Sequence, residues 1–117
     1  MKAVILAAGF GTRMRPLTDR VPKPLLPVGG HPLIYYNLFL LKKYGITDLL
    51  INVHYQADLL IQKLGTGADL GMRITYSKEP AILGTGGGIK NLQDLLGSGA
   101  FLVMNADILV DINLDRL

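Results

Sequence analysis

The residues of this sequence best suited to binding an anion are two glycines followed by a threonine and two arginines. Residues 9–15 read GFGTRMR, and they come directly after a short apolar run. The backbone N–H groups of a glycine-rich turn can approach phosphate oxygens closely, and an arginine fork binds polyphosphate well. A second basic residue, Lys23, follows between two prolines. Together, Thr12, Arg13 and Lys23 favour a phosphate site over a simple turn.

The charge distribution supports a local site for an anion. The net charge is +3, but residues 1–23 hold five basic side chains and one acidic one, whereas residues 24–117 hold seven and eight. Such a focused charge suits a small polyanion. A nucleic-acid binder would spread its basic residues along a face and interleave them with aromatic residues. We therefore expect no nucleic-acid partner.

Two further polar stretches follow apolar runs. Residues 84–88 read GTGGG, and Asp107 comes shortly after the apolar run Phe101–Met104. The glycine-rich stretch of residues 9–15 matches neither of two common phosphate motifs. It is not a Walker A motif, because no Gly-Lys pair is present, and it is not a dinucleotide fingerprint, because residue 14 is Met. Known short phosphate motifs therefore do not settle which phosphate compound binds.

Apolar runs and helical patterns alternate along the chain, and they predict the elements that position these residues. The predicted strands are Val4–Ala7, Asp48–Val53, Met72–Tyr76 and Phe101–Met104, and the predicted helices are Pro32–Tyr44, Ala57–Leu64 and Ile89–Leu96. This order predicts an α/β fold, with a mainly parallel Rossmann-like sheet and helices on both faces. Ligands of such sheets bind at the carboxyl ends of the strands, so the three polar stretches are expected along one edge.

Composition narrows the class of protein. Half of the 117 residues are hydrophobic and none is cysteine, which excludes disulfides, thiolate metal sites and a cysteine nucleophile. No apolar run reaches the ~18 residues of a membrane span. We expect a cytoplasmic protein with no membrane partner. The aromatic residues of the predicted helix Pro32–Tyr44 are expected in the core: Tyr35, Tyr36, Phe39 and Tyr44.

The motifs as a whole resemble those of the sugar-phosphate nucleotidyltransferases. The match comprises KAVILAAGFGTRMRPLT and then VPKPLLPVGGHPLI, with EPAILGTGGGI resembling the nucleotide-base loop and VMNADI the strand end with the metal aspartate. This family joins a nucleoside triphosphate to a sugar 1-phosphate and releases pyrophosphate. The chain looks most similar to uridylyl- or guanylyltransferases that act on N-acetylmuramate, heptose or mannose 1-phosphate. The base and the sugar stay open.

The resemblance implies a role for each matching residue. The backbone of five residues would line the nucleotide pocket: Leu6, Ala7, Ala8, Gly9 and Gly11. The side chains of Thr12 and Arg13 would hold the β- and γ-phosphates. The base and ribose would face Glu79, Gly84 and Thr85.

Catalysis and metal binding are implied for three further positions. Arg13 and Lys23 would be catalytic, with Lys23 near the α-phosphate and the incoming sugar phosphate, and Asp107 would hold Mg²⁺. A triphosphate and a sugar phosphate repel each other, and these positive charges would offset that repulsion. The family usually has glycine before the metal aspartate, where this chain has Ala106. Its methyl group either crowds the nucleotide or fills a gap.

Length sets the last expectation. Family members run well past 200 residues, and their second half carries most of the sugar pocket. We therefore expect residues 1–117 to be a truncated nucleotide-binding half, with the sugar-binding half absent and little turnover by the chain alone. Self-association could cover the exposed sheet edge. A non-catalytic nucleotide-binding regulatory module is the alternative.

Overall fold

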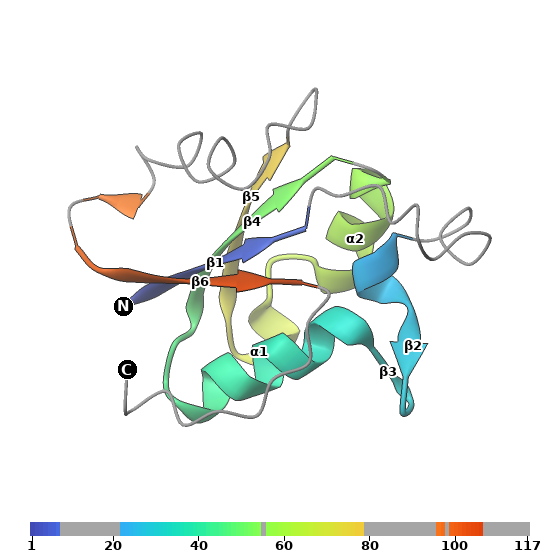
Figure 1. Ribbon diagram of the computed structural model, residues 1–117, viewed down its shortest axis with the longest axis horizontal. Coiled ribbons are helices and arrows are strands. Elements are labelled where there is room, and N and C mark those ends of the chain that lie inside the picture. The colour runs from blue at the N-terminus through green and yellow to red at the C-terminus, as the bar shows by residue number, and fades with distance from the viewer. Residues whose placement is uncertain (8–21, 55, 79–95, 98, 107–117) are drawn as a thin grey trace.

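The computed structural model describes residues 1–7, 22–54, 56–78, 96–97 and 99–106 of the chain. Four strands form one sheet in the order β5-β4-β1-β6, and every pair of neighbours is parallel (Figure 1). The strands are β1 (Lys2–Leu6), β4 (Asp48–Val53), β5 (Arg73–Lys78) and β6 (Phe101–Asn105). The α-helices are α1 (Leu33–Lys43) and α2 (Ala57–Leu64). The predicted parallel α/β sheet is confirmed, and β4 and α2 have the predicted bounds.

Alternation along the strands explains how the sheet is covered. Ile5 of β1 and Ile51 of β4 belong to the main core cluster, together with residues of both α1 and α2. The intervening Val4 and Leu50 are buried in a second cluster with Leu96. Both described α-helices therefore cover one face of the sheet. Leu96 ends the helix predicted over 89–96 and packs on the other face, while residues 89–95 lie outside the described part of the chain.

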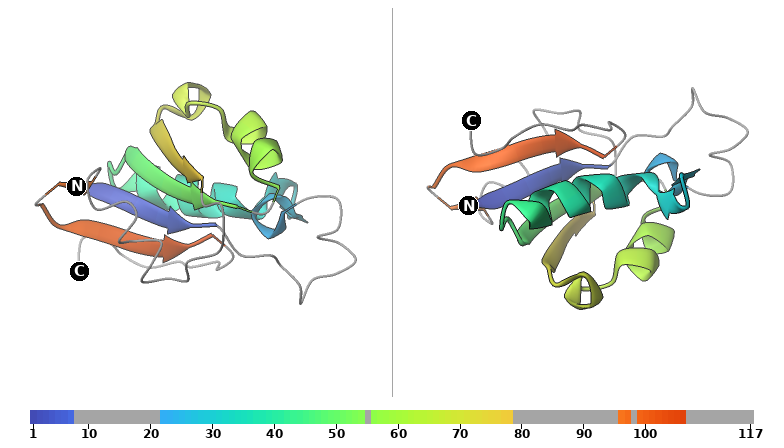
Figure 2. Two further views of the ribbon diagram at one scale, coloured as in Figure 1. Left: turned by 90° about the horizontal axis from the view of Figure 1, so that it is seen from above. Right: turned by 90° about the horizontal axis from the view of Figure 1, so that it is seen from below.

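Helix α1 covers the sheet with a narrow apolar stripe. Ile34, Leu38 and Leu41 are almost fully buried and are spaced at i, i+4 and i+7, which places them on one side of a helix. Figure 2 shows α1 running along the sheet beside β1. The helix begins after Pro32 and ends before Tyr44, and Gly45 follows with φ 75°, a left-handed conformation that glycine adopts readily. None of the described helices is long and apolar enough to cross a membrane.

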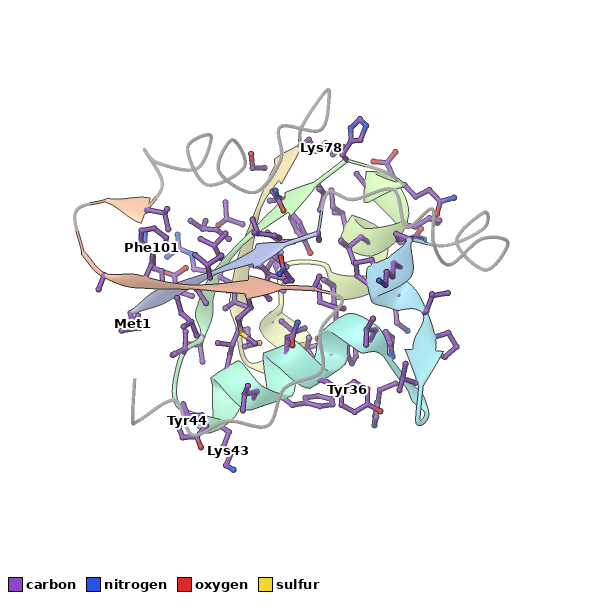
Figure 3. The ribbon with its side chains drawn as sticks, viewed as in Figure 1. Met1, Tyr36, Lys43, Tyr44, Lys78 and Phe101 are labelled. Atoms are coloured by element: carbon purple, nitrogen blue, oxygen red, sulfur yellow. The ribbon has the colours of Figure 1, made fainter. Side chains whose placement is uncertain are left out.

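The prediction that four aromatic residues of the segment Pro32–Tyr44 lie in the core holds in part. Tyr35 and Tyr44 are half-buried and pack against the main core cluster, whereas the prediction was wrong for Phe39. Phe39 is 42% exposed, because it lies on the side of α1 opposite the stripe that meets the sheet. Its ring contacts the rings of His31, Tyr35 and Tyr36 edge to face, with centroids 5.3, 5.9 and 6.3 Å apart. Figure 3 shows Tyr36 on the outer side of α1, where its hydroxyl donates to the carbonyl of Val28.

The described residues that precede α1 contain short elements that the sequence pattern did not reveal. A 3₁₀ helix, η3 (Lys23–Leu25), precedes a small antiparallel pair, β2 (Pro27–Val28) and β3 (His31–Pro32). Gly29 and Gly30 join the two strands with positive φ values of 57° and 89°. A second 3₁₀ helix, η4 (Ala68–Leu70), lies between α2 and β5.

Candidate active site

The site is best sought where the direction of the sheet order reverses. From β1 the chain builds outward to β4 and then β5, and it later places β6 on the other side of β1. Crevices form at such switch points, outside the carboxyl ends of the strands, and they are the usual ligand sites of open α/β sheets. In this chain the switch point lies between β1 and β6, whose carboxyl ends are at Leu6 and Asn105. The glycine loop follows the first of these strands and Asp107 follows the second.

Two hydrogen bonds fix the end of β1. The Ala7 N–H donates to the side-chain Oδ1 of Asn52 on β4, at 2.7 Å. The Leu6 carbonyl accepts from the Ala106 N–H, at 3.1 Å. Asn52 is only 3% exposed, so its amide is an internal part of the sheet. The last backbone groups before the glycine loop are therefore held from both sides.

The end of β6 is held by α1. Asn37 is 1% exposed, and its Nδ2 donates to the Asn105 carbonyl at 2.9 Å. Ala106 is also 1% exposed and belongs to the main core cluster. Its methyl group therefore fills space in the core, which is one of the two alternatives expected for an alanine at this position. Asp107 is the next residue in the sequence.

Lys23 begins the 3₁₀ turn η3, which hydrogen bonds close and attach to α1. The η3 turn is closed by a hydrogen bond from the Leu26 N–H to the Lys23 carbonyl at 3.1 Å. The Leu33 N–H at the start of α1 donates to the Leu26 carbonyl at 2.9 Å, which attaches the turn to the helix. Figure 1 shows this turn beside α2, on the side to which β1 and β6 point. Lys23 itself is half-buried.

Three of the predicted site residues fall within the described residues: Leu6, Ala7 and Lys23. The structure brings the first two to the β1 end and the third to the same edge of the sheet. The other predicted site residues lie outside the described part of the chain, and their roles stay predictions: Ala8, Gly9, Gly11, Thr12, Arg13, Glu79, Gly84, Thr85 and Asp107. Lys78, which ends β5 immediately before Glu79, pairs with Asp58 at 3.1 Å on the surface.

Sequence reasoning missed the two buried asparagines. Asn37 lies in a mostly apolar predicted helix and was given no role. Asn52 stood unremarked inside the predicted strand DLLINV. The signal that could have found them is an amide residue flanked by large aliphatic residues, because a buried amide needs a partner.

Burial raises the pKa of Tyr76 to about 12, and the nearby Tyr35 adds to the rise. The Tyr76 hydroxyl donates to the Gly65 carbonyl at 2.6 Å. Among the residues that the structure describes, no three His, Asp or Glu side chains gather closely enough to hold a metal ion.

The sheet order and the switch point between β1 and β6 define a Rossmann-like α/β fold. The chain belongs to the nucleotidyl transferase family, whose model matches residues 2–117. This confirms the resemblance stated from the motifs.

Individual relatives agree with this assignment. An N-acetylmuramate alpha-1-phosphate uridylyltransferase from Neisseria meningitidis is 52% identical over 114 residues, which are 97% of this chain and 49% of that protein. A mannose-1-phosphate guanyltransferase from Saccharomyces cerevisiae is 38% identical, and the match covers 95% of this chain and 32% of that protein. The chain thus spans half or less of the length of these curated relatives.

Among solved structures, HddC from Yersinia pseudotuberculosis in complex with GMP-PN superposes with a TM-score of 0.80 at 31% identity. The superposition covers 91% of this chain and 47% of that one. The fold is therefore that of the family.

Proposed function

We propose that this chain supplies the nucleotide-binding part of an enzyme that transfers a nucleoside monophosphate to a sugar 1-phosphate and releases pyrophosphate. The observation that carries the proposal is the meeting of the β1 and β6 ends, beside the turn of Lys23, at the switch point of a nucleotidyltransferase fold. Each of these strands leads directly into a stretch that matches a family motif. A triphosphate at this edge would meet backbone N–H groups, Thr12 and Arg13.

The chemistry needs positive charge more than it needs a nucleophile from the protein. A phosphate oxygen of the sugar 1-phosphate attacks the α-phosphorus of the triphosphate, a new P–O bond forms, and the bond to pyrophosphate breaks. Both reactants are anions, so Arg13 and Lys23 would lower their repulsion and stabilise the charge on the reacting phosphate. The rigid attachment of the Lys23 turn to α1 suits this role, because a lysine that must meet a reacting phosphate gains from a fixed backbone.

Mg²⁺ fits the residues at this edge in a limited way. Asp107 offers a hard oxygen ligand, and Mg²⁺ commonly binds through one or two carboxylates together with substrate phosphates. The described residues add no cluster of carboxylates there. Bound in this way, the ion would supply charge neutralisation at the phosphates. We therefore propose that Asp107 holds Mg²⁺ together with the triphosphate.

The substrate class is proposed from the relatives. The similar proteins named above are a uridylyltransferase and a guanyltransferase, so UTP and GTP are the favoured triphosphates. N-acetylmuramate 1-phosphate and mannose 1-phosphate are the corresponding sugar substrates. Glu79, Gly84 and Thr85 are proposed to face the base and ribose.

We further propose that residues 1–117 are the nucleotide-binding half of this machinery. The match covers 49% of the Neisseria relative, and the proposed sugar site would need residues beyond this half. These 117 residues by themselves are then expected to bind the triphosphate with little turnover. Self-association is retained as a proposal, since Phe101 and Val103 on β6 are 36% and 38% exposed.

The test is pyrophosphate release by the full-length protein with UTP or GTP, each sugar 1-phosphate and Mg²⁺. Lys23→Ala is expected to lower kcat by about 100-fold, the usual effect of removing one donor at a reacting anion. Lys43→Ala is the matched control, because Lys43 lies at the far end of α1, 5.5 Å from the ring of Tyr44, and should keep full activity. Triphosphate binding without any pyrophosphate release would favour the regulatory module instead.

A further inference from the structure

Two buried asparagines make the same kind of contact at the edge where the site lies. Asn52 of β4 and Asn37 of α1 are the two buried polar residues of the described chain, at 3% and 1% exposure. Each uses its side-chain amide to bind the main chain at the end of a different strand. Buried amides are costly unless they are paired, so their placement at these two strand ends calls for a reason.

Asn52 replaces a ladder hydrogen bond of the sheet. The Leu6 carbonyl points toward β6, where it accepts from Ala106, so the next residue along β1 points toward β4. With Leu6 in register with Asn52, a regular parallel ladder would give the Ala7 N–H the backbone carbonyl of Asn52 as its acceptor. The side-chain Oδ1 takes that place at 2.7 Å. A side chain thus fixes the position of Ala7 at the end of β1, and the backbone there need not continue parallel to β4.

Asn37 acts in the same way on β6. Its Nδ2 donates to the Asn105 carbonyl at 2.9 Å, across 68 positions of the sequence. Its Oδ1 has no hydrogen-bond partner within the described part of the chain. A leucine at this position of α1 would bury more apolar surface and leave no unpaired oxygen. Fold stability alone therefore does not explain the asparagine, whereas a need to hold the Asn105 carbonyl does.

The three hydrogen bonds form one continuous line across the ends of the strands. Asn52 holds Ala7, Leu6 binds Ala106, and the adjoining Asn105 is held by Asn37. The line runs from β4 through β1 and β6 to α1, and it passes directly beneath the switch point. We propose that Asn52 and Asn37 are positioning residues, which fix the directions in which β1 and β6 end and thereby align the triphosphate site. This inference rests on the proposed function and adds two residues to it.

The first experiment compares Asn52→Leu with Asn52→Asp in the full-length protein, with UTP and GTP as the probes. Leucine removes the acceptor and leaves the Ala7 N–H, on a residue 6% exposed, without a partner. We expect the KM for the triphosphate to rise by about tenfold, the factor expected for one unpaired buried amide. The KM for the sugar 1-phosphate should stay unchanged. Aspartate keeps the acceptor oxygen, so its triphosphate KM should lie closer to that of the wild type.

The second experiment compares Asn37→Asp with Asn37→Leu, where aspartate is now expected to fail as leucine does. Aspartate has the shape of asparagine but lacks the donor that reaches the Asn105 carbonyl. Asn37→Asp and Asn37→Leu should therefore both raise the Mg²⁺ concentration needed for the half-maximal rate, and both should lower kcat. Ile74→Val on β5 is the control, because it thins the same core cluster away from the line of contacts. It should lower the melting temperature and leave both kinetic constants alone.

Amide hydrogen exchange gives a readout that needs no substrate. The Ala7 and Ala106 amides should be protected in the wild type, and Asn52→Leu should speed exchange at Ala7 while the central β1 amides stay protected. Wild-type kinetics in Asn52→Leu, or losses no larger than those of Ile74→Val at equal melting temperature, would overturn the inference. Failure of the wild type to bind UTP or GTP would instead overturn the proposed function. Rapid Ala7 exchange in the wild type would then overturn the positioning role as well.

Discussion

Replacement of Ala106 by glycine restores the residue that the family usually has before its metal aspartate, and the structure predicts a cost rather than a gain. The Ala106 methyl is in the main core cluster and the residue is 1% exposed. Removing one buried methyl group costs about 0.8 kcal/mol. The greater backbone freedom of glycine in the unfolded chain adds about 0.5–1 kcal/mol. Ala106→Gly should therefore lower the free energy of unfolding by roughly 1.5 kcal/mol.

The assay is denaturant unfolding, followed by titration with UTP and GTP in the presence of Mg²⁺. Ala3→Gly is the matched control, because Ala3 is fully buried in the same cluster at the other end of β1. Both variants should lose similar stability, and both should keep the triphosphate affinity of the wild type. Tighter nucleotide binding by Ala106→Gly without a loss of stability would refute the reasoning, since it would mean that the methyl group faces the ligand.

Two further predictions concern the packing that supports the site. Gly67→Ala should destabilise the protein by about 1–3 kcal/mol through backbone strain alone, because its φ is 85°. The clash should add to this cost, since the new Cβ would lie 2.8 Å from the Cγ1 of Ile74. Gly30→Ala has a φ of 89° but open space around the new Cβ, so thermal melts should show a smaller loss. The pKa of Tyr76 is raised to about 12, so the folded state favours the neutral phenol. This preference contributes stability that is fully present below pH 10 and is lost as the pH rises from 10 to 12. Tyr76→Phe, which also loses the bond to Gly65, should show a shallower fall of stability over that range, and an identical fall in both proteins would contradict the assignment.

The sequence predicted the central strands well because β1 and β4 are buried on both faces. The run DLLINV could be matched to β4 residue by residue, since a continuous apolar run bounded by polar residues has little alternative in an alternating α/β pattern. The buried side of helix α1 was harder to predict, because apolar residues occur on most sides of the helix and no single apolar stripe is evident in its sequence. The spacing of Ile34, Leu38 and Leu41 decides which side meets the sheet, and it leaves Phe39 outside.

The motifs of the sequence predicted the candidate site but not the residues that hold the ends of its strands. Lys23 was predicted from the family pattern; the structure places it in η3, and its catalytic role stays a prediction. Asn52 and Asn37 carry no motif, and their partners are main-chain atoms 45 and 68 positions away. Such contacts depend on strand register and helix rotation, which a local pattern cannot give. The β2 and β3 pair was missed because each strand has only two residues.

Calorimetric titration of the protein with UTP and with GTP, in the presence of Mg²⁺, tests the central claim most directly. We predict saturable binding of one of the two triphosphates, and its loss in Arg13→Ala. Arg73→Ala is the matched control, and this variant should bind the triphosphate as the wild type does. Arg73 is exposed at the start of β5, away from the carboxyl ends of the strands. Absence of binding by the folded wild type, or equal binding by wild type and Arg13→Ala, would contradict a triphosphate site at the end of β1.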